Sequence, residues 1–469
     1  MFAAEFQSGS REYHVVTNAR EMELFYKASV ANGLTGWNYY MFSQGRNNRH
    51  TGYSGSTFYW YNPLTPEGDR TSAFPLVKRM NKIIETAESI IVEAGRKAEI
   101  CVLFYPPYYA TELERPVDGS CELQFTASAI RRPAYFDGLL KVLQVLNIDY
   151  DMMDLSKASA ETMKHYKQVW AFSTDEMNAP DQQTLVDYTR IGGNLVIFPY
   201  LPDREMSQKP CTIIRDALGV TPSGKEIIDS PLIDVFDLQD IKCANPVMVY
   251  SEKSLAGAEI IARSLRNSVC GFTKSFGNGS LTHLGTWIGF DTEGQKPVYE
   301  ALLNRSGAKL RQANAGNPDI AIRERFTGNH EALVFVANYY NEEHTGNVTY
   351  THPGNGETIP MPYTQPEMLL PAIYGILTPV CLEVAKELKI LHSTSDILKI
   401  DASEGKLQIT LYGDRDLVGE IVFEGPGIKN ISTATLQGNT IEPIVDPSRI
   451  AFAYNHLHKS EMMLTINLR

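Results

Sequence analysis

Continuous apolar runs alternate with helix-like patterns through the middle of the chain, and no other feature constrains the fold as strongly. The run AEICVLFY at 98–105 is apolar at nearly every position, and similar runs occur in KQVWAFST and NLVIFPY. Strands that are apolar throughout are buried on both faces, as in a parallel sheet covered by helices. Residues 97–315 are therefore predicted to form a doubly wound α/β domain.

The N-terminal segment has the same strand–helix–strand order. MFAAE is typical of the end of a buried strand, AREMELFYKASVANG places apolar residues at helical spacing before Gly33, and LTGWNYYMFSQG is an aromatic strand. This order implies a parallel crossover connection. A further helix is expected over about 73–94, so residues 1–96 are predicted to be a piece of a barrel or of a doubly wound sheet.

Beyond residue 315 the pattern changes to β-forming residues separated by turns. DIAIRERF, ALVFVANYY and NVTYTHP predict a small β-rich domain at 316–375. The first helix-like pattern in this part lies at 382–390. Strands at regular spacing then predict a β-sandwich at 376–469. The chain as a whole is thus expected to be α/β followed by all-β.

The overall charge and the cysteines argue against several classes of protein. The formal net charge is −12, so binding to nucleic acid or to an anionic membrane is not expected. The chain has no run of about 18 apolar residues, so no membrane span is expected. Its six cysteines include no C-x-x-C pair, which argues against a metal site and favours reduced thiols in the cytoplasm. No signal peptide is visible, although a segment ahead of Met1 would change that expectation.

No cofactor is expected either. The loop YPPYYATELE after the first strand of the middle domain contains two prolines, which lack the N–H donors of a phosphate cradle, so FMN is not predicted. The GGN sequence at 192–194 is interpreted as a helix-ending glycine pair and not as a nucleotide fingerprint.

Glu5 is the first candidate for chemistry. It lies where the first predicted strand gives way to a loop, and in a parallel barrel catalytic groups project from that face. An exposed surface carboxylate near a chain end would occupy the same position. The position of Glu5 alone therefore does not distinguish a catalytic residue from a surface residue.

Two segments in the right order resemble a known family. FAAEFQSG is similar to the strand-seven segment of family 35 β-galactosidases, and NYYMFSQGRN resembles their strand-eight segment. Residues 97–312 resemble the flavodoxin-like trimerisation domain of family 42 β-galactosidases, notably in DYTRIGGNLVIFPY. This combination looks most like the archaeal exo-β-D-glucosaminidases. The resemblance reaches the β-rich remainder only by architecture.

The resemblance implies that residues 1–96 are the last strands of a (β/α)8 barrel and that Glu5 is the nucleophile of a retaining glycosidase. Tyr40 falls on a tyrosine that contacts the sugar, and its phenol would keep the carboxylate anionic. Because side chains alternate along a strand, Asn38 shares the face of Tyr40 and is predicted to bind substrate. Trp37 is a candidate sugar platform if the strand bulges, and otherwise packs against the helices.

An aromatic cluster follows the second strand. Its residues are interpreted either as a carbohydrate-stacking wall or as the cover of a domain junction. The cluster consists of Tyr53, Phe58, Tyr59, Trp60 and Tyr61.

The general acid of a retaining glycosidase is not found. It must lie about 5 to 5.5 Å from the nucleophile, and the family places it on an earlier strand. Only four residues precede Glu5, whereas Glu12 and Glu23 follow it on a loop and a helix. The chain alone is therefore predicted not to hydrolyse glycosides.

Several functions and partners stay open at this point. The intact enzyme is expected to remove terminal β-linked galactose by double displacement, or else glucosamine from chitosan oligosaccharides. A separate chain carrying the N-terminal barrel strands and a homo-oligomer formed through the middle domain are the expected protein partners. The alternative of another class is a non-catalytic oligomerisation or carbohydrate-binding protein.

Overall fold

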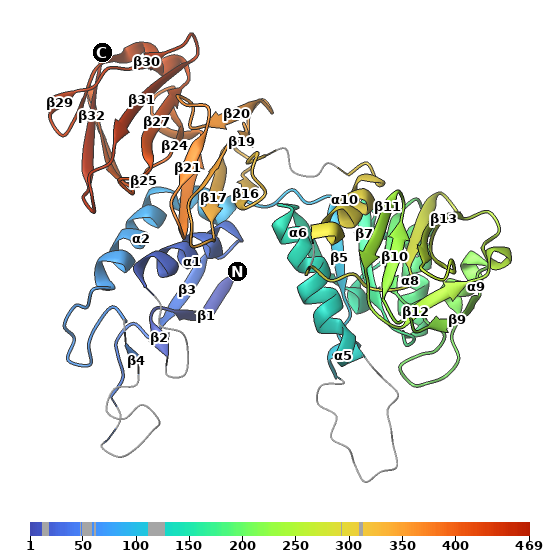
Figure 1. Ribbon diagram of the computed structural model, residues 1–469. Coiled ribbons are helices and arrows are strands. Elements are labelled where there is room, and N and C mark those ends of the chain that lie inside the picture. The colour runs from blue at the N-terminus through green and yellow to red at the C-terminus, as the bar shows by residue number, and fades with distance from the viewer. Residues whose placement is uncertain are drawn as a thin grey trace. The chain divides into compact units, whose positions relative to one another are not determined.

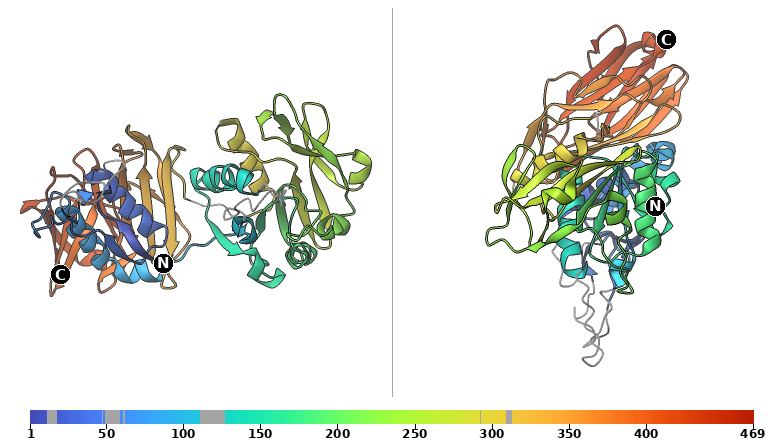
Figure 2. Two further views of the ribbon diagram at one scale, coloured as in Figure 1. Left: turned by 90° about the horizontal axis from the view of Figure 1, so that it is seen from below. Right: turned by 90° about the vertical axis from the view of Figure 1, so that its right-hand side faces the viewer.

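The computed structural model describes most of the chain, in the ranges 1–11, 18–46, 48, 59–60, 62–110, 127–291, 293–308 and 313–469. These residues form two compact units. The outer unit comprises Met1–Lys97 and Arg311–Arg469, and the inserted unit comprises Ala98–Leu310. Both chain ends belong to the outer unit (Figures 1 and 2). No helix in the described ranges is both long and apolar enough to span a membrane.

The outer unit begins with two parallel strands joined by a helix. These elements are β1 (Phe2–Gln7), α1 (Ala19–Ala31) and β3 (Gly36–Tyr40). Phe2 pairs with Gly36, and Gln7 pairs with Tyr40. The Asn18 side chain caps α1 by accepting hydrogen bonds from two backbone N–H groups of its first turn. The predicted strand–helix–strand order and the parallel crossover are confirmed.

The single helix predicted over 73–94 is instead two helices, α2 (Phe74–Thr86) and α3 (Glu88–Glu93). Ala87 between them has a φ of −121° and a ψ of 22°, outside the helical region. The two helices bury their apolar residues in different cores, because α2 packs with α1 and β1 whereas α3 packs against β17 (Ala332–Asn338). The break at Ala87 redirects the chain from one core to the other.

Helices α1 and α2 cover one face of the β1–β3 pair. The core between them contains Phe6, Tyr26 and Met80, each at most 3% exposed. On β3, the rings of Trp37 and Tyr39 pack against Phe6 at centroid distances of 5.3 and 6.3 Å. Parallel strands covered by helices on one face are consistent with a segment of a (β/α)8 barrel, whose helices form the outer layer.

The C-terminal part of the outer unit consists of antiparallel sheets. A three-stranded sheet has the order β16 (Ile320–Phe326), β17, β22 (Tyr374–Val380). Two short pairs accompany it: β18 (His344–Gly346) with β21 (Met368–Leu370), and β19 (Val348–Thr351) with β20 (Thr358–Met361).

Two five-stranded sheets follow and share one apolar core, so they form a β-sandwich. The first sheet has the order β23 (Leu382–Ala385), β24 (Leu388–Ser393), β27 (Val418–Glu424), β31 (Arg449–Asn455), β30 (Ile444–Val445). The second has the order β25 (Asp396–Ser403), β26 (Lys406–Tyr412), β32 (Met462–Leu468), β28 (Ile431–Leu436), β29 (Asn439–Thr440).

The prediction of a helix at 382–390 is wrong, because this segment forms the hairpin of β23 and β24. Glu387 in the turn has a φ of +59°, which lies in the left-handed region and ends any helix. Apolar residues alternate with polar ones on each strand, and the buried positions are Leu382, Val384, Leu388 and Ile390. Burial of this alternating face outweighs the helix propensity of the Ala, Lys and Glu residues between them.

The segment that precedes the inserted unit is held against the end of β16. Gly95 and Phe326 exchange two backbone hydrogen bonds of 2.9 and 2.8 Å, each donating its N–H to the carbonyl of the other. Gly95 lies just before the inserted unit, and Phe326 ends β16. This pair therefore ties the segment before the insertion to the three-stranded sheet of β16, β17 and β22.

The inserted unit is built on one mixed sheet. Its parallel strands lie in the order β6, β5, β7, β8, β15, which is 2-1-3-4-5 in chain order and matches flavodoxin-like doubly wound sheets. These strands are β5 (Ile100–Phe104), β6 (Tyr150–Asp154), β7 (Gln168–Ser173), β8 (Asn194–Pro199) and β15 (Gly279–Leu284). Antiparallel strands extend the sheet: β14 (Val269–Phe276), β13 (Glu259–Ser264), β10 (Leu232–Val235), β11 (Leu238–Lys242), β12 (Val247–Tyr250) and β9 (Pro222–Glu226).

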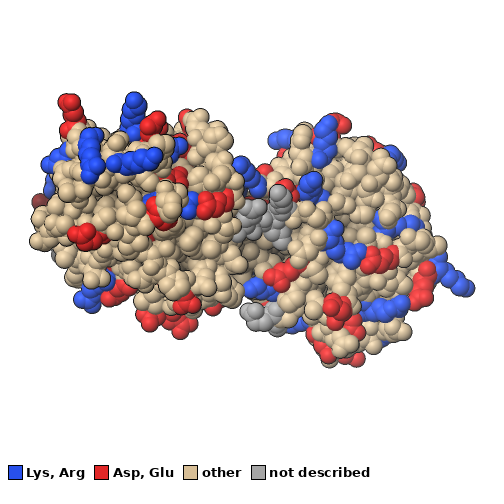
Figure 3. Space-filling model, turned by 90° about the horizontal axis from the view of Figure 1, so that it is seen from above, with Lys and Arg blue, Asp and Glu red and all other residues tan. Residues whose placement is uncertain are grey.

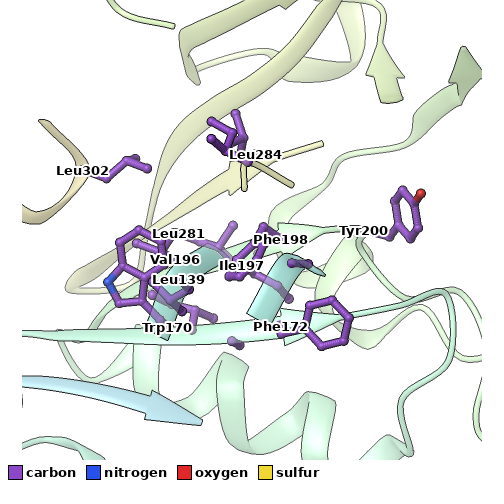
Figure 4. Close-up of a cluster of buried hydrophobic side chains, with 14 of the residues drawn as sticks. Leu139, Trp170, Phe172, Val196, Ile197, Phe198, Tyr200, Leu281, Leu284 and Leu302 are labelled. Carbon is purple, nitrogen blue, oxygen red and sulfur yellow. The ribbon is translucent and has the colours of Figure 1, made fainter. Parts of the chain in front are cut away.

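Helices pack on this sheet around a large apolar core. Tyr299 of α10 (Lys296–Asn304) stacks on Trp170 of β7 at 5.9 Å, and Figure 4 shows Leu139 beside the same indole. Helix α8 (Ala179–Arg190) packs against β8 and β15 and is followed by Gly192 at φ +121°, so the glycine pair ends a helix as predicted. The other helices are α4 (Pro107–Ala110), α5 (Ala127–Arg131), η2 (Arg132–Leu140), α6 (Lys141–Val145), α7 (Ala160–Met163) and α9 (Ile213–Leu218).

Glu420 in β27 is a carboxylate buried inside the sandwich part. It accepts hydrogen bonds from the backbone N–H groups of Tyr363 and Thr364 at 2.6 and 2.7 Å, and its Oε1 lies 2.9 Å from Nε2 of His392. Burial raises the pKa of Glu420, but the hydrogen bonds and the nearby imidazole lower it by more, so its pKa lies below the ordinary value of 4.5.

This carboxylate is expected to make the outer unit acid-sensitive. A folded pKa below the unfolded one adds stability above pH 4.5, and this contribution is lost as the pH falls below that value. Glu420→Gln is expected to lower the free energy of unfolding at pH 7 by about 1–3 kcal/mol and to flatten its decline between pH 5 and pH 3. Urea unfolding across this pH range, with the exposed Glu404→Gln as control, measures both effects. Parallel pH profiles for the two variants would contradict this role of Glu420.

Candidate active site at the ends of β1 and β3

Glu5 lies on the side of the strand pair that the helices leave open. Its neighbour Phe6 points into the core and is 3% exposed, whereas the Glu5 side chain is exposed. Ala3 pairs with Trp37 and Phe6 pairs with Tyr39, so a shift in register places both Ala4 and Glu5 opposite the single residue Asn38. Asn38 is also exposed, and its Nδ2 donates to the Ala4 carbonyl at 3.3 Å. The structure thus brings Glu5 and Asn38 together on one open face.

Trp37 and Tyr40 are placed differently from each other. Trp37 is half-buried in the aromatic core, so its ring lies on the helix-facing side of the strands and not with Glu5. Tyr40 ends β3, is half-buried, and pairs with Gln7. Because side chains alternate, Tyr40 shares the face of Asn38. Of the four residues predicted for the site, the structure therefore leaves Trp37 apart.

A buried hydrogen-bond network ties the ends of the two strands together. Ser8, which follows β1, donates its hydroxyl to the carbonyl of Met41, which follows β3. Asn62 donates Nδ2 to the same carbonyl at 2.7 Å, and Thr71 donates its hydroxyl to the Asn62 carbonyl. Ser8 and Asn62 are at most 1% exposed. Neither residue was predicted for the site, although a Ser before Gly9 and an Asn before Pro63 are typical of turns.

The proposed aromatic wall is only partly described. Tyr59 and Trp60 form β4, which pairs with β2 (Ser10–Arg11) through the backbone. Outside the described residues lie Tyr53, Phe58, Tyr61 and Glu12.

Glu23 is a carboxylate of a different kind from Glu5. It accepts hydrogen bonds from Lys27 Nζ at 2.8 Å and from Arg79, and Lys27 also lies 2.8 Å from Asp396 of β25. Burial disfavours ionisation of Glu23, but the charges of Lys27 and Arg79 outweigh it and hold its pKa at about 2. Glu23 is therefore anionic at neutral pH and does not have the protonated state that a general acid needs.

A second group of reactive side chains lies in the β-rich part. His352, Cys381 and Glu424 form the one cluster of three metal-ligating side chains in the part of the chain that the structure describes. Nδ1 of His352 accepts backbone N–H groups from Gly354 and Asn355 at 3.1 and 3.3 Å. Nε2 consequently carries the proton and donates to Glu424 at 3.0 Å. In this tautomer the imidazole is a hydrogen-bond donor toward the cluster and not a metal ligand.

The switch point of the inserted sheet lies at the C-terminal ends of β5 and β7, where flavodoxin-like folds bind ligands. Within the described residues, tyrosines occupy it. The hydroxyl of Tyr108 donates to the Glu176 carbonyl at 2.6 Å, and that of Tyr105 donates to Asp181 at 2.7 Å. The cavity between these rings and Phe172 is about 10 Å³, room for one water molecule at most.

Comparisons with known proteins show that the chain is similar to carbohydrate-active enzymes. Residues 120–255 match the family model described as GLMA-like, second domain.

Curated relatives in sequence include a transferase and a hydrolase. The chain is 32% identical over 358 residues to a beta-1,2-glucosyltransferase of Ignavibacterium album, a match that covers 74% of this chain and 49% of the relative. It is 29% identical over 337 residues to an exo-beta-D-glucosaminidase of Pyrococcus horikoshii, covering 70% of this chain and 42% of the relative. The chain thus spans about half the length of these relatives, or less.

Solved structures show the same fold at low sequence identity. A beta-galactosidase from Bacillus circulans sp. alkalophilus superposes with a TM-score of 0.61 at 16% identity, covering 80% of this chain and 54% of that one. A GH42 beta-galactosidase from G. stearothermophilus gives a TM-score of 0.62 at 12% identity, with coverages of 80% and 53%.

Proposed function

We propose that this chain is the C-terminal part of a retaining enzyme that processes terminal β-linked sugars, with Glu5 as its nucleophile. The position of Glu5 carries the proposal, because its exposed carboxylate lies beside Asn38 on the helix-free face of a parallel strand pair. In a (β/α)8 barrel that face lines the interior, and catalytic groups gather at the strand ends. The family 35 resemblance of the Glu5 and Tyr40 segments supports the same assignment.

The proposed reaction has two steps. The Glu5 carboxylate attacks the anomeric carbon, the bond from this carbon to the leaving oxygen breaks, and a carboxylic acid gives its proton to that oxygen. A water molecule or a sugar hydroxyl then attacks the anomeric carbon, passes its proton to the same acid, and releases Glu5. A hydrogen bond from Tyr40 would keep Glu5 anionic before attack. Asn38 would bind a sugar hydroxyl.

The molecule that accepts the sugar in the second step determines whether the reaction is hydrolysis or glycosyl transfer. Water gives a glycosidase, such as a β-galactosidase or an exo-β-D-glucosaminidase acting on chitosan oligosaccharides, and a sugar hydroxyl gives a glycosyltransferase. The names of the curated relatives include both outcomes, a glucosyltransferase and a glucosaminidase.

The general acid is proposed to lie on barrel strands outside this chain, in a preceding segment or in a separate chain. The chain alone is then expected to release no nitrophenol from aryl β-galactosides, β-glucosides or β-glucosaminides. Addition of a protein that supplies six barrel strands with an Asn-Glu pair is expected to start turnover. Release by the purified chain alone would disprove the placement of the acid.

Self-association through the inserted unit is a further part of the proposal. Light scattering of the full chain at micromolar concentration is expected to give a multiple of 52.4 kDa. A strictly monomeric mass would contradict it. The alternative function, a non-catalytic oligomerisation or carbohydrate-binding protein, predicts the same multiple but no turnover after the barrel strands are added.

A further inference from the structure

A pocket of about 140 Å³ opens in the outer unit, away from the residues proposed for catalysis. The first turns of α1, the middle of α2, the start of β22 and the turns next to β26 and β32 form its walls. Glu5, Asn38 and Tyr40 do not line it. A pocket of this size suits a small molecule and not a polymer.

The carboxylates that line the pocket already have cationic partners. Glu23 is paired with Lys27 and Arg79, and Asp414 is paired with Arg20. A cation entering the pocket would have to displace one of these ion pairs. The pocket is therefore poorly suited to a metal ion or an amine.

Three basic side chains that line the pocket have N–H groups without a hydrogen-bond partner among the described residues. The Nε of Arg79 is buried and has no hydrogen-bond partner among the described residues. The side chains of His458 and Lys459 line the pocket and make no hydrogen bond or ion pair within the same residues. Because the Arg79 Nε has no accessible surface, His458 and Lys459 are the unpaired basic groups that a ligand in the pocket can reach.

The charge of the pocket differs from that of the chain. Arg20, Arg79, Arg415 and Lys459 line the pocket together with two carboxylates, whereas the formal net charge of the chain is −12. Arg415 has a third carboxylate, that of Asp416, at 3.6 Å, which leaves Lys459 as the cation without a counter-ion among the described residues. On the face that Figure 3 shows, acidic and basic side chains are interspersed, without a single-sign field.

The wall also offers aromatic and hydrogen-accepting groups. Tyr374 and Tyr412 line the pocket, and the Arg79 guanidinium lies 4.2 Å from the ring centre of Tyr412. Aromatic faces suit the C–H face of a sugar ring. Ionised carboxylates such as Asp414 have several lone pairs, so they accept hydroxyl donors while they remain ion-paired.

We infer that this pocket binds a monosaccharide that carries one anionic group, a phosphate or a carboxylate. The anionic group lies against Lys459 and His458, and the hydroxyl groups donate to the carboxylate of Asp414. A neutral sugar leaves Lys459 without a counter-charge, and inorganic phosphate leaves the tyrosine wall uncovered. The site is independent of the proposed catalysis at Glu5.

Titration calorimetry of the full chain at low salt tests this inference. The ligands are glucose 6-phosphate, glucuronate, glucose and inorganic phosphate. At least one of the two anionic sugars is expected to bind at least about tenfold more tightly than glucose and than inorganic phosphate. A preference for glucose 6-phosphate identifies the anionic group as phosphate, and a preference for glucuronate identifies it as carboxylate.

Charge reversal at the rim provides the matched comparison. Lys459→Glu is expected to weaken binding of the preferred sugar at least about tenfold, because it replaces the free cation by an anion. Lys386→Glu makes the same change on the exposed turn between β23 and β24 and is expected to leave the affinity unchanged. Both variants are at exposed sites, so both are expected to unfold at the temperature of the parent chain.

Three results would overturn the inference. The first is the absence of binding of both anionic sugars at millimolar concentration. The second is an affinity for glucose or for phosphate equal to that for the anionic sugars. The third is equal affinity of the preferred sugar for Lys459→Glu and Lys386→Glu.

Discussion

Glu5→Gln is expected to lower glycoside cleavage by about 10⁴-fold or more once the chain is joined with its barrel strands, because the amide cannot form the glycosyl-enzyme bond. Release of nitrophenol from an aryl β-glycoside measures this loss. Glu67→Gln, on a loop that pairs with the segment after β3, is the matched control and is expected to retain most of the activity. Retention of more than about a tenth of the activity by Glu5→Gln would rule out a nucleophilic role.

A smaller side chain at position 5 tests whether Glu5 is the nucleophile or the acid–base residue. Glu5→Ala opens space for azide, which would attack the anomeric carbon from the face that Glu5 occupied. The expected product is the α-glycosyl azide, because a single displacement inverts the β-configuration. Formation of the β-glycosyl azide would mean that Glu5 is the acid–base residue, which would reverse its assignment.

Lys27→Met is expected to cause the largest loss of stability. Lys27 is fully buried, lies 2.8 Å from both Glu23 and Asp396, and donates to the Gly375 carbonyl at 2.9 Å. Its removal leaves two carboxylates with one buried cation, Arg79, between them. A broken buried ion pair costs about 3–5 kcal/mol of unfolding free energy. Urea unfolding followed by circular dichroism measures this change.

Two comparisons show whether the cost comes from the buried charge. Lys82→Met removes an exposed partner of Glu461 and is expected to cost at most about 1 kcal/mol. Adding Asp396→Asn to Lys27→Met removes one uncompensated carboxylate, so the double variant is expected to be less destabilised than the sum of the single changes. A simple sum, or equal effects of Lys27→Met and Lys82→Met, would show that this network contributes little.

Local patterns predicted much of the fold. Gly33 ends the sequence of α1 as expected, and the apolar runs of β5, β7 and β8 indicated a parallel sheet. The predictions that failed concern segments whose structure depends on the elements against which they pack. The break at Ala87 depends on two different cores, and the hairpin at 382–390 depends on the sheet that buries its alternating face.

The candidate site was predictable only in part. The family-like segments drew attention to Glu5 and Asn38, whose neighbouring positions follow from the strand register. The ties from Ser8 and Asn62 to Met41 join residues far apart in sequence, and no local signal specifies such contacts. The rings of Trp37 and Phe6 likewise meet only after the strands pair.

The pairing of Gly95 with Phe326 limits the order in which the outer unit folds while the chain is being synthesised. Gly95 meets Phe326 only after the whole inserted unit has left the ribosome, and the core beneath β1 and β3 also contains Leu398 from the sandwich. The inserted unit has its own core and is free to fold first. The core beneath β1 and β3 is therefore complete only after Leu398 has been made, although α1 and α2, which supply most of it, are made much earlier.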